Sequence, residues 1–217
     1  DMGKLALRIN GSQFTLPDGR RDFEVIAWRQ AADARIAAPL IYADEDQRYF
    51  VSRYIDNRLP RGPAPGEEWG RLAIDILKRC HALDLDGPVL DYRSHIEAYW
   101  QQIEQRGLQV DPALHEQRSL IIAALDDLGS QQAGTALCHH DPIPANFAGD
   151  SSRLYLLDWE YAALGWPVMD FAALAVEWSI DHESICRQTG ISAQALARAG
   201  TVYRYLCNLW NELTAPE

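Results

Sequence analysis

The sequence predicts an α+β protein of two lobes, with a small β-rich N-terminal lobe and a larger, mostly helical C-terminal lobe. Three observations support this. Short apolar runs with strand character precede residue 57, and long segments with apolar residues at helical spacing follow residue 66. Between them lies the Pro- and Gly-rich stretch NRLPRGPAPGEEW. We therefore expect residues 1–56 to form the N-terminal lobe and residues 57–217 the C-terminal lobe.

The N-terminal lobe is expected to contain three strands and one helix. LALRI, residues 5–9, is a short apolar run that predicts a strand. Apolar residues at helical spacing predict a helix over 22–35. The runs PLIYAD and RYFVSRYI, separated by the turn-like DED, predict two further strands.

Most of the C-terminal lobe is predicted to be helical, and glycines at 107, 129 and 134 punctuate its helices. The strong strand candidates in this half are ALCH and RLYLLDW. The segments predicted to be amphipathic helices are 67–83, 92–106, 112–128, 168–179 and 193–213.

Composition bounds the possible functions. The chain has 217 residues, 47% of them apolar and 24% charged, which is typical of a soluble globular protein. No apolar run reaches the ~18 residues of a membrane span, and DMGKLALRIN has no secretory pattern. Four cysteines without a CxxC indicate free thiols and a cytoplasmic location. The net charge of −11 argues against nucleic acid and suits a cationic small molecule, although it also fits a protein kept in solution by its charge.

The stretch HHDPIPAN, followed by LYLLD, carries the chemistry. His139, Asp141 and Asn146 have the spacing H-x-D-x-x-x-x-N, and the two prolines between them predict a rigid loop. A hairpin of two short strands would bring Asn146 beside Asp158. Their oxygens suit Mg²⁺, and Asp141 could accept a proton from an attacking hydroxyl, as phosphoryl transfer requires. The alternative is a pair of surface turns with solvated acids, which the spacing disfavours.

These motifs resemble the aminoglycoside phosphotransferase and choline kinase superfamily, the small-molecule relatives of the protein kinases. HxDxxxxN followed by LLDWEYA carries the resemblance most specifically. LALRIN, DFEVIAWRQAADARIAAPLIY and LKRCHALD extend it over nearly the whole chain. The resemblance implies a protein-kinase-like two-lobe fold, with ATP and Mg²⁺ as cofactors.

The resemblance also implies roles for single residues. Asp141 matches the catalytic base, and Asn146 and Asp158 match the magnesium ligands. Arg8 matches the residue that binds ATP phosphates, with Lys4 a weaker candidate, and Glu24 matches the helix acid that pairs with Arg8.

Three residues near the motif complete this set. Glu160 matches an acid that lies near the metal and the substrate in choline and thiamine kinases. His139 is expected to brace the loop, and Asp170 to tie the start of the following helix to it. His140, between His139 and Asp141, occupies a variable position of the motif and is expected to face solvent.

The sequence DWEYA favours the choline, ethanolamine and thiamine kinase branch, whose substrates are small amine-bearing alcohols. Glu177 and Trp178 match an acid and an aromatic residue that suit an ammonium group, and Trp210 matches part of an aromatic cage. A second cage tryptophan is replaced by Leu213, so choline itself is left open. Tyr203 and Tyr205, on the same helix, are expected to lie mainly in the core.

The family pattern places two strands and a phosphate-binding loop before the Arg8 strand, so the N-terminal lobe is expected to be incomplete in this chain. The predicted function is ATP-dependent phosphorylation of the hydroxyl of an amine-bearing alcohol. The alternatives are the same reaction on thiamine, an aminoglycoside or another small alcohol, or a non-catalytic nucleotide-binding pseudokinase. The sequence sets no oligomeric state.

Overall fold

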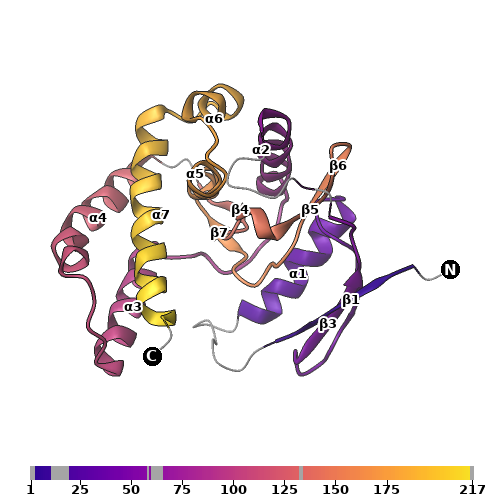
Figure 1. Ribbon diagram of the computed structural model, residues 1–217, viewed down its shortest axis with the longest axis horizontal. Helices are drawn as coiled ribbons and strands as arrows, with labels where there is room; N and C mark the ends of the chain where they lie inside the picture. Colours follow the sequence, from indigo (N-terminus) through magenta and orange to yellow (C-terminus); the bar gives the residue numbers. More distant parts are fainter. Residues whose placement is uncertain (1–2, 11–19, 58, 60–65, 132–133, 216–217) are drawn as a thin grey trace.

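A computed structural model describes residues 3–10, 20–57, 59, 66–131 and 134–215 (Figure 1). Within this part the fold has two regions of different character. A three-stranded sheet with one helix lies on one side, and a group of helices lies on the other (Figure 1). Residues 60–65, in the middle of the predicted connector, lie outside the described part. The lobe boundary between residues 56 and 57 therefore stays a prediction.

The sheet contains β1 (Leu5–Ile9), β3 (Tyr49–Arg53) and β2 (Leu40–Ala43), paired antiparallel in the order β1-β3-β2. Alternate residues of β3 are buried, as a sheet covered on one face requires. The covering element is α1 (Arg20–Asp33), whose Trp28 meets Phe50 edge to face at 5.9 Å. The helix and three strands expected here are all present.

The helical region holds α2 (Glu67–His81), α3 (Tyr92–Arg106), α4 (Pro112–Gln131), α5 (Pro167–Glu177), α6 (His182–Thr189) and α7 (Ala193–Thr214). Residues 168–175 of α5 are buried without interruption, which makes α5 the central helix of this region. The long α7 packs against α3, α4 and α5 (Figure 1). None of the described helices is long and apolar enough to cross a membrane.

Short strands lie between the two regions and carry the motif. β4 (Ala136–Cys138) pairs with β7 (Ala163–Gly165), and β5 (Phe147–Asp150) forms a hairpin with β6 (Arg153–Leu156). A single 3₁₀ turn, Pro144–Asn146, leads into β5. The Leu156 N–H donates to the Ile36 carbonyl at 2.7 Å, so the hairpin is joined to the segment that follows α1.

The structure adds two elements that the sequence did not predict, α6 and β7. The side chain of Asp181 accepts from the Ser184 N–H at the start of α6, and Gly190 follows its end in the left-handed conformation. These capping signals were readable in the sequence. α4 also continues past Gly129 to Gln131, so this glycine does not end the helix. A Cβ at Gly129 would lie 3.3 Å from Trp166, so the glycine allows the indole to pack closely against α4.

Candidate functional site

Residues 139–146 follow β4 and carry the expected base, Asp141, so we call them the catalytic loop; the His139 side chain packs beneath this loop. Its side chain is completely buried, and Nε2 donates to the Leu157 carbonyl at 2.9 Å. The Asp141 N–H approaches its Nδ1 at 3.3 Å. The ring therefore links the loop after β4 to the end of β6, which is the bracing contact expected of it.

Asp170, at the start of α5, holds the same loop from a second side. Its carboxylate accepts from the N–H groups of His139 and His140, each at 2.8 Å, and from His81 Nε2 at 2.9 Å. Although burial opposes ionisation, the hydrogen bond and charge of His81 lower the pKa of Asp170 to about 2. The ligand atoms of His81, Cys138 and Asp170 lie within 4.8 Å of one another, but the Asp170 oxygens are already engaged by N–H donors. This cluster therefore ties the loop to α5 and α2 and is not a metal site.

Asn146 and Asp158 are brought together as the hairpin predicted. The Leu157 N–H donates to the Asn146 carbonyl at 2.8 Å, which sets the two residues on adjacent strand ends. Asn146 Nδ2 donates to Asp141 Oδ2 at 2.7 Å and to the Asp141 carbonyl at 2.9 Å, which leaves its amide oxygen for a cation. Asp158 Oδ1 is buried and faces the Arg8 guanidinium, whose Nη1 lies 2.7 Å away. An amide oxygen and a carboxylate are ligands of the kind that Mg²⁺ takes.

Asp141, the expected base, has a carboxyl with a raised pKa. Burial raises the pKa of its carboxyl to about 6, the Asn146 hydrogen bond opposes this, and nearby Asp158, Glu160 and Glu177 add to it. A carboxyl with a pKa this close to neutrality can accept a proton more readily than an ordinary aspartate.

Arg8 joins the sheet to the motif. Its Nη1 lies 2.6 Å from Glu24 Oε1 and 2.7 Å from Asp158 Oδ1, and its Nη2 lies 3.0 Å from Glu160 Oε2. Burial raises the pKa of Glu24 to about 7, against the lowering effect of Arg8. Lys4, the other candidate for phosphate binding, has a side chain that is 78% exposed, and its Nζ lies 3.9 Å from Asp56 Oδ1 and 5.6 Å from the centre of the Tyr54 ring. The structure thus favours Arg8 as the cation of this site.

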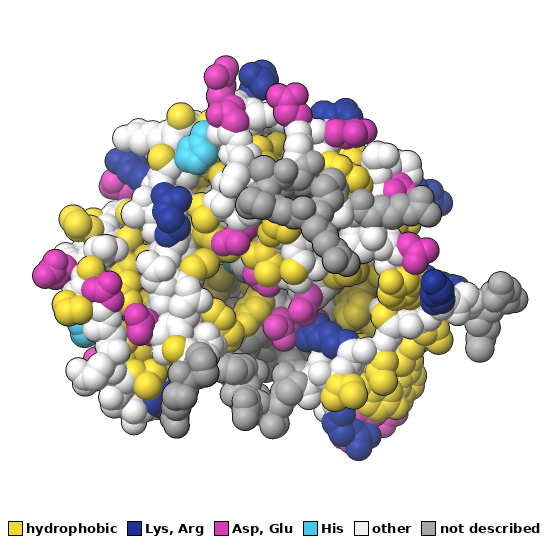
Figure 2. Space-filling view, in the orientation of Figure 1, with side chains coloured by type: hydrophobic (Ala, Val, Ile, Leu, Met, Phe, Trp, Pro, Cys, Tyr) yellow, Lys and Arg dark blue, Asp and Glu magenta, His cyan; other side chains and the backbone are white. Residues whose placement is uncertain are grey.

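A pocket of about 580 Å³ adjoins Asp141. Acidic side chains gather in the hollow between the helical region and the β1–β3 sheet (Figure 2). The acidic and aromatic residues that line the pocket are Asp141, Glu160, Glu177, Tyr92, His95, Tyr99, His140, Tyr161, Tyr203 and Trp210. Carboxylates and aromatic faces in one cavity suit a small organic cation.

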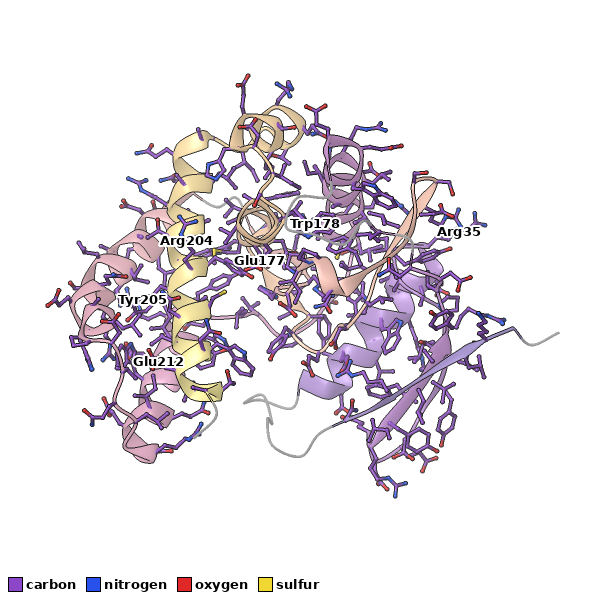
Figure 3. The ribbon with its side chains drawn as sticks, in the orientation of Figure 1. Arg35, Glu177, Trp178, Arg204, Tyr205 and Glu212 are labelled. Atoms are coloured by element: carbon purple, nitrogen blue, oxygen red, sulfur yellow. The ribbon has the colours of Figure 1, made fainter. Side chains whose placement is uncertain are left out.

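Glu177 is held by a tyrosine that the sequence assigned to the core. Tyr203 is largely buried, lines the pocket and donates its hydroxyl to Glu177 Oε1 at 3.2 Å. Burial raises the pKa of Tyr203, so the hydroxyl stays a donor. Glu177 lies at the end of α5, facing α7, whereas Tyr205 lies on the side of α7 that meets α3 and α4 (Figure 3). Tyr205 is therefore a core residue, as expected, whereas Tyr203 also lines the pocket.

Two expectations for side chains near the motif differ from the structure. Trp178, expected to face the substrate, is buried and outside the pocket, because its Nε1 donates to the Pro142 carbonyl at 3.1 Å and its ring packs on Phe147. It supports the catalytic loop from behind. His140, expected to face solvent, is turned into the pocket wall.

The aromatic pocket residues of α3 were missed by the sequence reasoning. Tyr92, His95 and Tyr99 lie three and four residues apart, so they share one face of the helix. That spacing was readable, but it is equally typical of a core face. Trp210, which was expected at the pocket, does line it.

Comparison with known proteins gives consistent matches. A family model described as the phosphotransferase enzyme family matches residues 1–206. Protein LicA of Haemophilus influenzae is 36% identical over 47 residues, which span 22% of this chain and 18% of that protein. The curated relative is thus matched over only a small part of its own length.

Solved structures match over nearly the whole chain. A choline/ethanolamine kinase family protein from Mesorhizobium loti has a TM-score of 0.79 at 21% identity, covering 97% of this chain and 74% of that one. Choline kinase LicA from Streptococcus pneumoniae has a TM-score of 0.76 at 22% identity, covering 96% and 77%. At these identities the likeness concerns the fold, and it confirms the protein-kinase-like two-lobe architecture.

Proposed function

The chain belongs to the phosphotransferase enzyme family, and from that premise we propose that it transfers the γ-phosphate of ATP to the hydroxyl of a small amine-bearing alcohol of the choline and ethanolamine class. One observation carries the proposal. The pocket beside Asp141 combines the carboxylates of Glu160 and Glu177 with the aromatic faces of Tyr161 and Trp210. Such a pocket attracts an ammonium group by charge and by cation–π contact, and Asp141 lies at its wall to receive the hydroxyl.

The reaction follows from the position of each side chain. Asp141 accepts the hydroxyl proton as the substrate oxygen attacks the γ-phosphorus, and the bond to the bridging oxygen of ADP breaks. Asn146 holds the Asp141 carboxylate in place through its amide nitrogen. Arg8, oriented by Glu24, would neutralise phosphate oxygens.

Magnesium would be held by the amide oxygen of Asn146 and the carboxylate of Asp158, which lie on adjacent strand ends. When bound, it spreads the negative charge of the transferring phosphate. Asp158 now pairs with Arg8 at 2.7 Å, so binding of the nucleotide and its metal requires the guanidinium to turn from this carboxylate toward the phosphates.

The ammonium-binding wall departs from a double-tryptophan cage. Leu213, at the position of the second tryptophan, is buried. Trp210 instead lies 6.4 Å from the Tyr161 ring, nearly perpendicular to it, and 6.1 Å from Tyr99. Tyrosine faces bind cations more weakly than tryptophan. The wall nevertheless combines aromatic faces with carboxylates, which supports an amine-bearing alcohol as the substrate class.

The experiment is coupled ADP release with ATP and Mg²⁺ across choline, ethanolamine, thiamine, homoserine and an aminoglycoside. We expect turnover on choline or ethanolamine, and a loss of about 10²–10⁴ in kcat for Asp141→Asn with ATP binding retained. Turnover on thiamine or an aminoglycoside alone would contradict the proposed substrate class but would still support phosphate transfer to a hydroxyl. Magnesium-dependent ATP binding without turnover on any alcohol would indicate a nucleotide-binding module instead.

A further inference from the structure

His140 directly precedes the proposed catalytic base and has an uncommon backbone conformation. Its φ of 66° lies in the left-handed region, where histidine, asparagine and aspartate are enriched among the residues other than glycine. Its N–H donates to Asp170 Oδ1 at 2.8 Å, which holds this conformation. The imidazole is thereby directed into the pocket wall.

The hydrogen bonds of the ring fit one neutral tautomer. Nδ1 lies 3.1 Å from the Tyr161 carbonyl, which can only accept, so Nδ1 carries the hydrogen. Nε2 lies 3.0 Å from the Tyr92 hydroxyl. That hydroxyl accepts from the Trp166 N–H at 3.1 Å, so its own hydrogen is available for Nε2. A neutral imidazole satisfies every donor and acceptor in this chain of bonds.

The backbone of β7 at Gly165 leaves room for this pair. A Cβ on Gly165 would lie 2.5 Å from His140 Nε2 and 2.7 Å from the Tyr92 hydroxyl. Since real Cβ atoms do not approach so closely, only glycine leaves room for both groups. Three segments therefore surround the imidazole: α3, the segment that carries Tyr161, and β7.

The bridge connects two parts of the pocket that have separate tasks. On one side, His140 belongs to the loop that carries Asp141, where the substrate hydroxyl would lie. On the other it holds the backbone of Tyr161, which follows Glu160 and whose ring faces Trp210 at 6.4 Å. The imidazole thus links the segment at the hydroxyl end of the pocket to the segment at its ammonium end.

We propose that His140, as a neutral imidazole bonded to Tyr92 and to the Tyr161 carbonyl, is a positioning residue that sets the hydroxyl-to-ammonium spacing the pocket accepts. This rests on the proposed function, because it needs a substrate that carries both groups. A fixed wall favours one spacing, since a misplaced reacting atom lowers the rate steeply. Loosening the wall should weaken binding of the matched substrate and reduce discrimination against a mismatched one.

The test compares kcat/KM for ethanolamine with that for its homologue containing one more methylene, in wild type, His140→Asn, Tyr92→Phe and the double variant. Asparagine tolerates the left-handed conformation but is too short to reach both partners. His182→Asn, on the exposed start of α6, is the matched control. We expect each single variant to raise the KM for ethanolamine and to lower the discrimination ratio by about tenfold, with the KM for ATP unchanged.

The double variant should lose no more than either single one, because both changes break the same bridge. Imidazole nitrogen chemical shifts, assigned through His140→Asn among the six histidines, should give a neutral ring protonated on Nδ1. An active wild type whose ratio and KM are unchanged by His140→Asn would overturn this inference alone, as would a ring protonated on Nε2. A wild type inactive on every amine-bearing alcohol would overturn the proposed function first, and this inference with it.

Discussion

At the scale of single residues, Arg8 links the sheet to the catalytic segment. Its guanidinium contacts Glu24, Asp158 and Glu160, and the Glu24 side chain is fully buried. A buried carboxylate needs a partner, because desolvation without pairing costs several kcal/mol. Arg8 therefore has two roles, stabilisation of the fold and the proposed binding of nucleotide phosphates. Mutation can separate them.

Arg8→Met should destabilise the protein by about 3–5 kcal/mol, because it leaves Glu24 buried without its cation. Urea unfolding measures this. The double variant Arg8→Met, Glu24→Met should recover most of the stability while ATP affinity stays weak. Lys4→Met is the control and should change stability by less than about 0.5 kcal/mol, since Lys4 is exposed. If the double variant also regained ATP affinity, Arg8 would have no part in phosphate binding.

Glu177 can be tested without disturbing its surroundings. Glu177→Gln keeps an oxygen that can accept from the Tyr203 hydroxyl and removes the charge. We expect the KM for ethanolamine or choline to rise about tenfold, with the KM for ATP unchanged, because a charged partner of the ammonium is lost. Glu183→Gln, an exposed acid on α6, serves as the control. Equal kinetics for both variants would mean that the ammonium does not meet Glu177.

At the scale of elements, Asp170 joins α5 and α2 to the catalytic loop. Its pKa is lowered to about 2 in the fold, against about 3.9 for an unfolded aspartate. A carboxyl with a lowered pKa contributes stability that is present above pH ~4 and is lost as the pH falls toward 2.

Asp170→Asn should therefore cost about 3–5 kcal/mol at neutral pH, through loss of a buried ionic network. The difference in unfolding free energy between wild type and variant should become smaller by roughly 1 kcal/mol as the pH falls from 6 to 3. Urea unfolding at each pH measures this difference. Asp126→Asn, at an exposed pair with Arg93, should change little. A difference that is constant with pH would mean that the Asp170 charge does not stabilise the loop.

The elements that the sequence predicted well are those whose signals are local. Short apolar runs predicted β1 to β3, helical periodicity predicted α1 to α5 and α7, and the motif predicted the hairpin that joins Asn146 to Asp158. Periodicity identifies a buried face but not what covers it. Tyr203 and Tyr205 are two residues apart on α7, yet one meets the pocket and the other the core.

The side chains around the loop depend on contacts between distant segments. The indole of Trp178 turns inward because the Pro142 carbonyl, 36 residues earlier, accepts its N–H. The imidazole of His140 turns inward because Tyr92 and Tyr161, from two other segments, provide its partners. No pattern within a single segment could have predicted either orientation, because each is decided by the packing of the whole lobe.

At the scale of the whole molecule, the net charge of −11 and the acidic hollow act in the same direction (Figure 2). An acidic cleft raises the local concentration of a cationic substrate. The effect weakens with salt, since the screening length falls from about 30 Å at 0.01 M to about 8 Å at 0.15 M.

The KM for choline should therefore rise several-fold between about 0.01 M and 0.15 M salt, at saturating ATP and Mg²⁺. The uncharged isostere, with a tert-butyl group in place of the trimethylammonium, is the matched substrate control. It fills the same volume without charge, so its KM should be higher at low salt and nearly independent of salt. A parallel rise for both alcohols would attribute the salt effect to the nucleotide or to the fold. A rise for choline alone would mean that the acidic hollow selects its substrate by charge before the aromatic wall makes contact.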